Sequence, residues 1–216
     1  MSKDFLEGFE FSPDGNYSEI PSHKAFKTLL LKVFAKHGLS NSKNVVEIGA
    51  GNGEYANFLT EKGFNVAIIE PSTSGLDIIR TRFPALEVIA CEPYGTFRRS
   101  LDPDKEYFYI SLEVIEHCFD PLLFLQSINE SMAPGEHLIV STPYHGYLKN
   151  LIIGILGKWD QHFNVFWKNG HIKFFSIPTL SKLANYAGFE VVEIVGYGRI
   201  PFLWRGMFAV LKKPRA

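Results

Sequence analysis

Short apolar runs alternate along most of this chain with segments whose apolar residues recur every three or four positions. The short runs predict strands and the longer periodic segments predict helices. The predicted strands cover residues 44–48, 65–69, 86–90, 107–111, 137–142, 191–195 and 207–211. The predicted helices run from a cap at Ser22 to Gly38 and over about residues 55–62, 75–82, 121–132 and 178–187. Strands that alternate with helices indicate a parallel sheet covered on both faces.

The end of the chain breaks this alternation. Residues 143–175 form a long insertion after the fifth strand, rich in aromatic and histidine residues. Residues 196–206 then leave no room for a crossover helix before the last strand, so that strand is expected to be antiparallel. We therefore predict an α/β fold with a doubly wound, seven-stranded, mostly parallel sheet. Residues 1–40 are assigned to an N-terminal arm and helix, and residues 41–216 to the main domain.

Composition narrows the function classes. The 216 residues are 46% hydrophobic and carry a formal net charge of −1, which is typical of one ordinary globular domain. No basic stripe is present, so we expect no nucleic-acid partner. The most apolar run, residues 151–157, is far shorter than the roughly 20 residues that span a bilayer. The first residues lack the apolar core of a secretion signal, and we expect a cytoplasmic protein.

A glycine-rich turn follows the first predicted strand. It contains Gly49, Gly51 and Gly53, and Glu70 closes the second strand. Ligands of parallel sheets bind outside the carboxyl ends of the strands, where glycines let the backbone approach closely. A terminal acidic residue on the second strand suits the two hydroxyls of a ribose.

Two cofactors fit a turn of this kind. A nicotinamide dinucleotide requires G-x-G-x-x-G, whereas Glu54 breaks that spacing here and would oppose a pyrophosphate at the start of the helix. S-adenosylmethionine has no phosphate, and its positive charges tolerate a carboxylate such as Glu47. The turn therefore favours S-adenosylmethionine. A dehydrogenase and a tight turn without any ligand remain the alternatives.

Four runs, VVEIGAGNGEY, IIEPS, SLEVIEHCFDP and MAPGEHLIVSTP, resemble the class I S-adenosylmethionine-dependent methyltransferases. The resemblance covers about residues 44–212. Glu113-Val-Ile-Glu116-His117, together with Gly170-His171-Ile-Lys-Phe174, is most similar to the ubiquinone-biosynthesis O-methyltransferase branch, which methylates hydroxyls of polyprenyl benzene intermediates. Pro143-Tyr144 departs from the Leu-Asn of that branch. The resemblance implies a Rossmann-like methyltransferase fold.

The resemblance also implies a set of site residues. The methionine end of the donor is expected near Glu47 and the turn, the ribose at Glu70, the adenine after the third strand, and the donor's methyl side at the end of the fourth strand. The residues concerned are Glu47, Gly49, Ala50, Gly51, Gly53, Glu70, Pro71, Cys91, Glu92, Ser111 and Leu112.

Metal and base candidates follow the fourth and fifth strands. Glu113, Glu116 and His117 have the spacing that shares one face of a helix, which suggests a divalent cation such as Mg²⁺ beside the acceptor hydroxyl. A structural motif at the start of a helix is the alternative. His145 and His171 are the candidate catalytic bases, because histidine titrates near neutral pH. Either histidine would also suit a structural hydrogen bond.

Residues 143–175 are the expected acceptor cover. Tyr147, Leu151 and Ile155 predict the apolar face of a short helix, flanked by Lys149 and Lys158. Such a helix suits weak membrane-surface contact through residues 147–158, a lid over an apolar acceptor, or packing on the protein's own core. The predicted function is methyl transfer from S-adenosylmethionine to a hydroxyl of a small-molecule acceptor, aromatic or lipid-linked. Methylation of nitrogen or carbon, and a non-catalytic donor-binding partner protein, are the alternatives.

Overall fold

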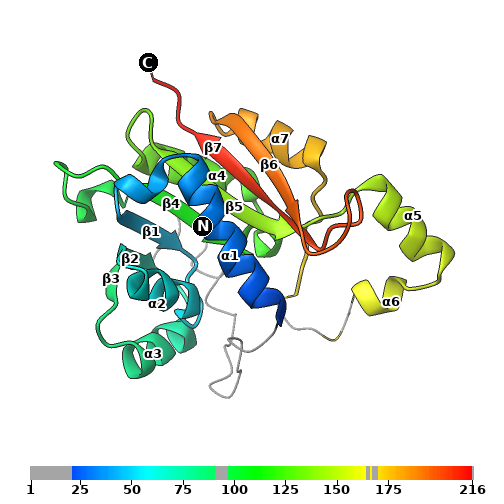
Figure 1. Ribbon diagram of the computed structural model, residues 1–216, viewed down its shortest axis with the longest axis horizontal. Coiled ribbons are helices and arrows are strands. Elements are labelled where there is room, and N and C mark those ends of the chain that lie inside the picture. The colour runs from blue at the N-terminus through cyan, green and yellow to red at the C-terminus, as the bar shows by residue number, and fades with distance from the viewer. Residues whose placement is uncertain (1–20, 91–96, 164–165, 167–169, 216) are drawn as a thin grey trace.

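The computed structural model describes residues 21–90, 97–163, 166 and 170–215 as a single twisted sheet with helices on both sides (Figure 1). The strands are β1 (Asn44–Ile48), β2 (Asn65–Ile69), β3 (Glu87–Ala90), β4 (Phe108–Leu112), β5 (His137–Pro143), β6 (Glu190–Tyr197) and β7 (Gly206–Lys212). The helices are α1 (Pro21–Lys36), α2 (Glu54–Glu61), α3 (Thr73–Arg82), α4 (Pro121–Ser131), α5 (Tyr147–Ile155), α6 (Trp159–His162) and α7 (Ile177–Tyr186).

The strand order confirms the predicted fold class. The seven strands are arranged β3-β2-β1-β4-β5-β7-β6. The first five are parallel to one another, and β7 pairs antiparallel with both β5 and β6. The short connection before β7 therefore forms a hairpin, as its length predicted.

Alternate side chains of the strands pack into two apolar layers. On one face, Val45 of β1 and Ile110 of β4 pack with Phe34 of α1, and α2 and α3 complete the layer. On the other face, Val46 and Tyr109 pack in the layer that α4 and α7 cover. Helix α1 thus contributes directly to the core of the sheet domain.

The helix ends follow local sequence signals. The Asp120 carboxylate accepts a hydrogen bond from the Leu123 backbone N–H and caps α4, with Pro121 in its first turn. Ser176 and Thr179 form a capping box at the start of α7. Among the described residues, no helix is both long enough and apolar enough to cross a membrane.

Candidate active site

The candidate site lies at the carboxyl edge of the parallel strands. Ile48 at the end of β1 is in register with Ile69 at the end of β2, and Leu112 of β4 is in register with Ser141 of β5. The antiparallel strand β7 starts at this same edge, because Gly206 pairs with Pro143. Turns after four parallel strands and the β6–β7 hairpin therefore meet in one region (Figure 1).

The turn after β1 needs its glycines for conformation and for packing. Gly49, Gly51 and Gly53 have φ angles of 76°, 59° and 79°, in the left-handed region. A Cβ atom on Gly49 would lie 2.7 Å from Cγ2 of Val114, and one on Gly53 would lie 2.9 Å from Cγ1 of Ile79. The turn therefore brings bare backbone to the edge of the sheet, and the side chains of Val114 and Ile79 leave no room for a Cβ atom at Gly49 or Gly53.

Glu70 joins this turn to the start of α3. One carboxylate oxygen accepts a hydrogen bond of 2.6 Å from the Gly51 N–H, and the other accepts one of 2.7 Å from the Ser72 N–H. Burial raises the pKa of Glu70 to about 7, against the opposing effect of these two donors. Glu70 thus holds the glycine turn in place, a role that the sequence pattern did not reveal, and Pro71 separates it from Ser72 in the chain.

Glu47 presents an unpartnered carboxylate oxygen behind the turn. Its side chain is 1% exposed, and among the described residues no donor reaches its Oε2 atom. Burial, and secondarily the charge of Glu70, raise its pKa to about 8. A buried carboxylate with a free oxygen is costly unless a cation meets it. The ammonium group of S-adenosylmethionine has the charge and the donors that this oxygen lacks.

Two of the four other residues expected to contact S-adenosylmethionine at the strand ends are among the described residues. Ser111 is fully buried, and its hydroxyl has no hydrogen-bond partner among the described residues. Leu112 is also buried at the end of β4. Cys91 and Glu92 lie outside the described residues.

Glu113 takes an unusual backbone conformation directly after β4. Its φ is 57°, uncommon for a residue with a side chain. The Glu113 N–H donates to the Ser141 carbonyl and hydroxyl oxygens, at 3.2 and 2.9 Å. Its Oε1 atom accepts hydrogen bonds from the Ser141 hydroxyl at 2.7 Å and from the Tyr197 hydroxyl at 3.0 Å. Four contacts with β5 and β6 therefore hold Glu113.

This conformation keeps residues 113–117 from forming one continuous helix. Only a 3₁₀ turn forms, at Ile115–His117, because the left-handed Glu113 separates it from β4. Glu113, Glu116 and His117 have the spacing of one helix face, but here they do not lie on a common helix. Ser141 and Tyr197 were missed because they lie 28 and 84 residues from Glu113.

A different group of potential metal ligands comes together. The ligand atoms of Glu116, His117 and His171 all lie within 4.8 Å of one another. Glu116 is fully buried, and both of its carboxylate oxygens lack a hydrogen-bond partner among the described residues. The Ile172 and Lys173 N–H groups donate to the Glu116 carbonyl at 2.9 and 3.0 Å, which brings the returning insertion to this turn.

The electrostatics of this group suit a cation. Burial and the charge of Glu113 raise the pKa of Glu116 well above its usual value. Burial and the neighbouring His117 lower the pKa of His171 to about 4, so its imidazole is neutral at pH 7. A buried carboxylate with two adjacent imidazoles fits a divalent cation, and such mixed ligands suit Mn²⁺, Fe²⁺ or Zn²⁺ better than Mg²⁺.

His145 lies at the start of the insertion. Its ring contacts the Phe174 ring at a centroid distance of 4.9 Å, and its backbone N–H donates to the Phe175 carbonyl at 2.8 Å. Burial and the charge of Lys149 lower its pKa to about 4. The neutral imidazole therefore lies beside the aromatic residues of the insertion.

Helix α5 exposes apolar side chains and buries a lysine. Lys149, predicted to flank an apolar face, is 6% exposed, whereas Tyr147 and Ile155 are 82% and 74% exposed. Within α5 the buried residues are Lys149 and Ile153. Packing on the protein's own core was therefore the wrong alternative for most of this helix.

Comparison with known proteins agrees with this geometry. A profile of the methyltransferase domain family matches residues 21–194. The chain belongs to that family. Ubiquinone biosynthesis O-methyltransferase of Azorhizobium caulinodans is 25% identical to this methyltransferase over 158 residues, 70% of the chain and 60% of that enzyme. The enzyme of the same name from Nitrosospira multiformis is 23% identical over 197 residues, 87% of the chain and 79% of that enzyme.

A solved structure supports the same fold. An S-adenosylmethionine-dependent methyltransferase from Aquifex aeolicus aligns with a TM-score of 0.65 at 16% identity, covering 94% of this chain and all of that one. The methyltransferase described here spans about three fifths of the length of the Azorhizobium enzyme. The predicted family resemblance is thus confirmed.

Proposed function

We propose that this methyltransferase transfers the methyl group of S-adenosylmethionine to a hydroxyl oxygen of a small-molecule acceptor. The observation that carries the proposal is the buried, unpartnered Oε2 atom of Glu47 behind a glycine turn that Glu70 holds in place. This arrangement offers an anion for the donor's ammonium group and open backbone for its methionine chain. The names of the relatives favour oxygen over nitrogen or carbon as the methylated atom.

The donor would lie along the carboxyl edge of the sheet. In the proposal, Glu47 receives the ammonium group, and the turn Gly49–Gly53 lies along the methionine chain. Glu70 and Pro71 lie at the ribose, Cys91 and Glu92 at the adenine, and Ser111 and Leu112 face the sulfonium side. Each Glu70 oxygen accepts one hydrogen bond from the described residues and keeps capacity for a ribose hydroxyl.

The chemical step is an in-line displacement. A lone pair of the acceptor oxygen forms a bond with the methyl carbon, and the electrons of the breaking carbon–sulfur bond remain on sulfur, giving S-adenosylhomocysteine. The hydroxyl proton passes to a base. His145 and His171 are the proposed bases, because each imidazole is neutral at pH 7 and has a nitrogen that can accept the proton. His171 takes this role only when it does not ligate a cation. Alignment of donor and acceptor supplies the remaining acceleration.

Glu116, His117 and His171 are the proposed ligands of a divalent cation, with Glu113 beside them. A cation held there would lower the pKa of a bound acceptor hydroxyl. Thermal unfolding with added Mn²⁺, Zn²⁺ or Mg²⁺ tests this site. We expect Mn²⁺ or Zn²⁺ to raise the melting temperature of the wild type, and Glu116→Gln to abolish that increase. An equal increase in Glu116→Gln would contradict the metal site, and Glu61→Gln on the exposed end of α2 is the control.

The exposed apolar side of α5 is the proposed site of weak membrane-surface contact through residues 147–158. Tyr147 and Ile155 would enter the lipid, and Ile200 and Phe202 of the β6–β7 hairpin are also exposed. A lid over an apolar acceptor is the alternative. Sedimentation with anionic phosphatidylglycerol vesicles should fall for Ile155→Ser and stay unchanged for Tyr186→Ser, which alters an exposed side chain on α7. Equal sedimentation of all three proteins would contradict membrane contact.

Binding and transfer assays test the main proposal. Calorimetric titration should detect binding of S-adenosylmethionine and S-adenosylhomocysteine to the protein, and no binding of NADH. Methyl-labelled donor should then transfer label to a component of a bacterial metabolite extract. Binding of donor and product without any transfer would favour the non-catalytic binding protein. Binding of NADH alone would favour a dehydrogenase and overturn the proposal.

A further inference from the structure

The insertion between β5 and α7 leaves and rejoins the sheet domain at one place. Tyr144 forms an isolated β-bridge with Phe175, and the His145 N–H donates to the Phe175 carbonyl at 2.8 Å. The Tyr144 N–H donates to the Arg205 carbonyl at 3.1 Å, which joins this neck to the β6–β7 hairpin. Helix α5 therefore begins directly after this neck, and its orientation depends on contacts near it.

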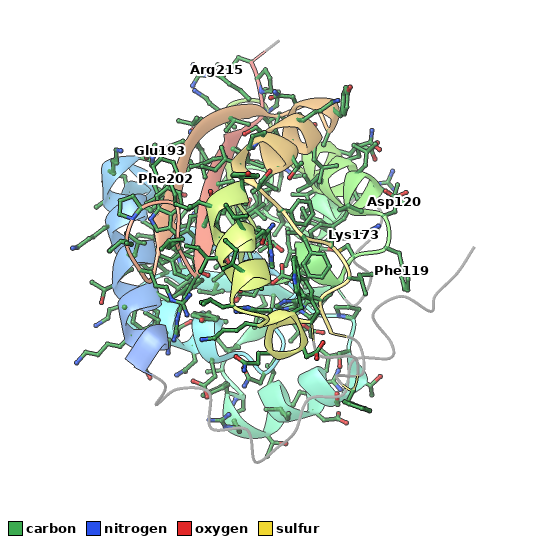
Figure 2. The ribbon with its side chains drawn as sticks, turned by 90° about the vertical axis from the view of Figure 1, so that its right-hand side faces the viewer. Phe119, Asp120, Lys173, Glu193, Phe202 and Arg215 are labelled. Atoms are coloured by element: carbon green, nitrogen blue, oxygen red, sulfur yellow. The ribbon has the colours of Figure 1, made fainter. Side chains whose placement is uncertain are left out.

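Lys149 makes such a contact from the first turn of α5. Its ammonium group donates to the Tyr144 carbonyl at 2.6 Å and to the Arg205 carbonyl at 3.4 Å. One side chain thus links α5, the end of β5 and the β6–β7 hairpin. In Figure 2, α5 lies in front of the strands, between Phe202 of the hairpin and Lys173 of the returning segment.

Lys149 is buried without an acidic side chain in contact with its ammonium group among the described residues. The side chain is 6% exposed. Burial and the charge of Arg199 lower its pKa to about 8, whereas Glu113 opposes this effect. An apolar chain of similar length, such as methionine, would avoid the cost of burying an ammonium group. The lysine must therefore supply a directed contact that an apolar chain cannot make.

We infer that Lys149 is a positioning residue that fixes the acceptor-covering insertion against the carboxyl edge of the sheet. The role in acceptor binding rests on the proposed function. The ammonium group holds the two carbonyls at the neck, so α5 keeps one orientation over the region that contains His145 and Glu113. Loss of the ammonium group releases α5 without disturbing the donor-binding turn after β1, which lies on other elements.

Hydrogen exchange followed by mass spectrometry tests this role. We compare the wild type with Lys149→Met, with Lys149→Arg, which keeps the charge, and with Lys158→Met, which removes an exposed charge from the same insertion. Amides of α5 should exchange at least tenfold faster in Lys149→Met than in the wild type. Lys158→Met should exchange like the wild type, and Lys149→Arg should recover part of the protection. The dissociation constant of S-adenosylhomocysteine should stay within twofold in all four proteins.

Two results would overturn the inference. Unchanged exchange of α5 in Lys149→Met would show that Lys149 does not hold the helix. Faster exchange throughout the sheet would show a general structural role instead of positioning. Failure of the wild type to bind S-adenosylhomocysteine would overturn the proposed function, and the exchange of α5 would still decide the role of Lys149.

Discussion

The ionisation of Glu47 is expected to control how strongly the protein binds S-adenosylmethionine. Burial raises the pKa of Glu47 to about 8, so about one tenth of the molecules carry the ionised carboxylate at pH 7. The donor's ammonium group requires that charge. Ionising Glu47 at pH 7 therefore costs about 1.4 kcal/mol of the binding free energy, and this cost falls as the pH rises.

The predicted pH profile is bell-shaped. An α-amino group has a pKa of about 7.8, so the fraction of molecules with both an ionised Glu47 and a protonated ligand rises about twentyfold from pH 6 to pH 8. Affinity should follow that rise and fall again by pH 9. Glu70, whose pKa is about 7, titrates in the same range, so a variant is needed to isolate Glu47.

Glu47→Gln supplies that comparison. The amide keeps the size of the side chain and removes its charge, so affinity at pH 8 should fall at least about tenfold, because a hydrogen bond to a charged group is worth about 1.5–3 kcal/mol. Calorimetry at pH 6, 7, 8 and 9 measures both effects, with Glu61→Gln as the control. A wild-type affinity that does not change from pH 6 to pH 8, or a Glu47→Gln variant with the full wild-type profile, would refute the reasoning.

Three further predictions concern stability, measured by urea unfolding. Gly49→Ala should lower the free energy of unfolding by about 1–3 kcal/mol more than Gly63→Ala does. Both glycines have positive φ, but only a Cβ atom at Gly49 meets another side chain, that of Val114, so equal losses would contradict this reasoning. Glu70→Gln should cost about 1–3 kcal/mol, because the amide NH₂ faces a backbone donor, and no loss would contradict the observed pairing. The wild type should gain stability relative to Lys149→Met as the pH rises from about 8 to 10.5, because the folded state binds the Lys149 proton less tightly than the unfolded state. A stability difference that stays constant over this range would contradict the lowered pKa of Lys149.

Local patterns were sufficient to predict the sheet and its glycine turn. Short apolar runs predicted the strands. The segment before β7 is too short for a crossover helix, so the antiparallel hairpin followed from the length of that connection. Glu47 and Glu70 were found as site candidates because each has a fixed place relative to a strand end. Their place in the chain determined their place at the edge of the sheet.

Contacts between distant segments were not predictable in this way. Tyr197 reaches Glu113 across 84 residues, and no periodic pattern links the two. The spacing of Glu113, Glu116 and His117 would suit a helix, but Glu113 is left-handed and its contacts with Ser141 and Tyr197 hold it in that conformation. In α5, periodicity identified two faces but did not show which one the protein covers. Lys149 is buried because its ammonium group donates hydrogen bonds to two backbone carbonyls from other segments.

A crystal structure of the protein with S-adenosylhomocysteine tests the central claim most directly. The account predicts the ligand's ammonium group within hydrogen-bond distance of Glu47 Oε2, its methionine chain along the turn from Gly49 to Gly53, and its ribose hydroxyls at Glu70. Ligand bound away from the carboxyl edge of the sheet, or Glu47 still without a partner in the complex, would contradict it.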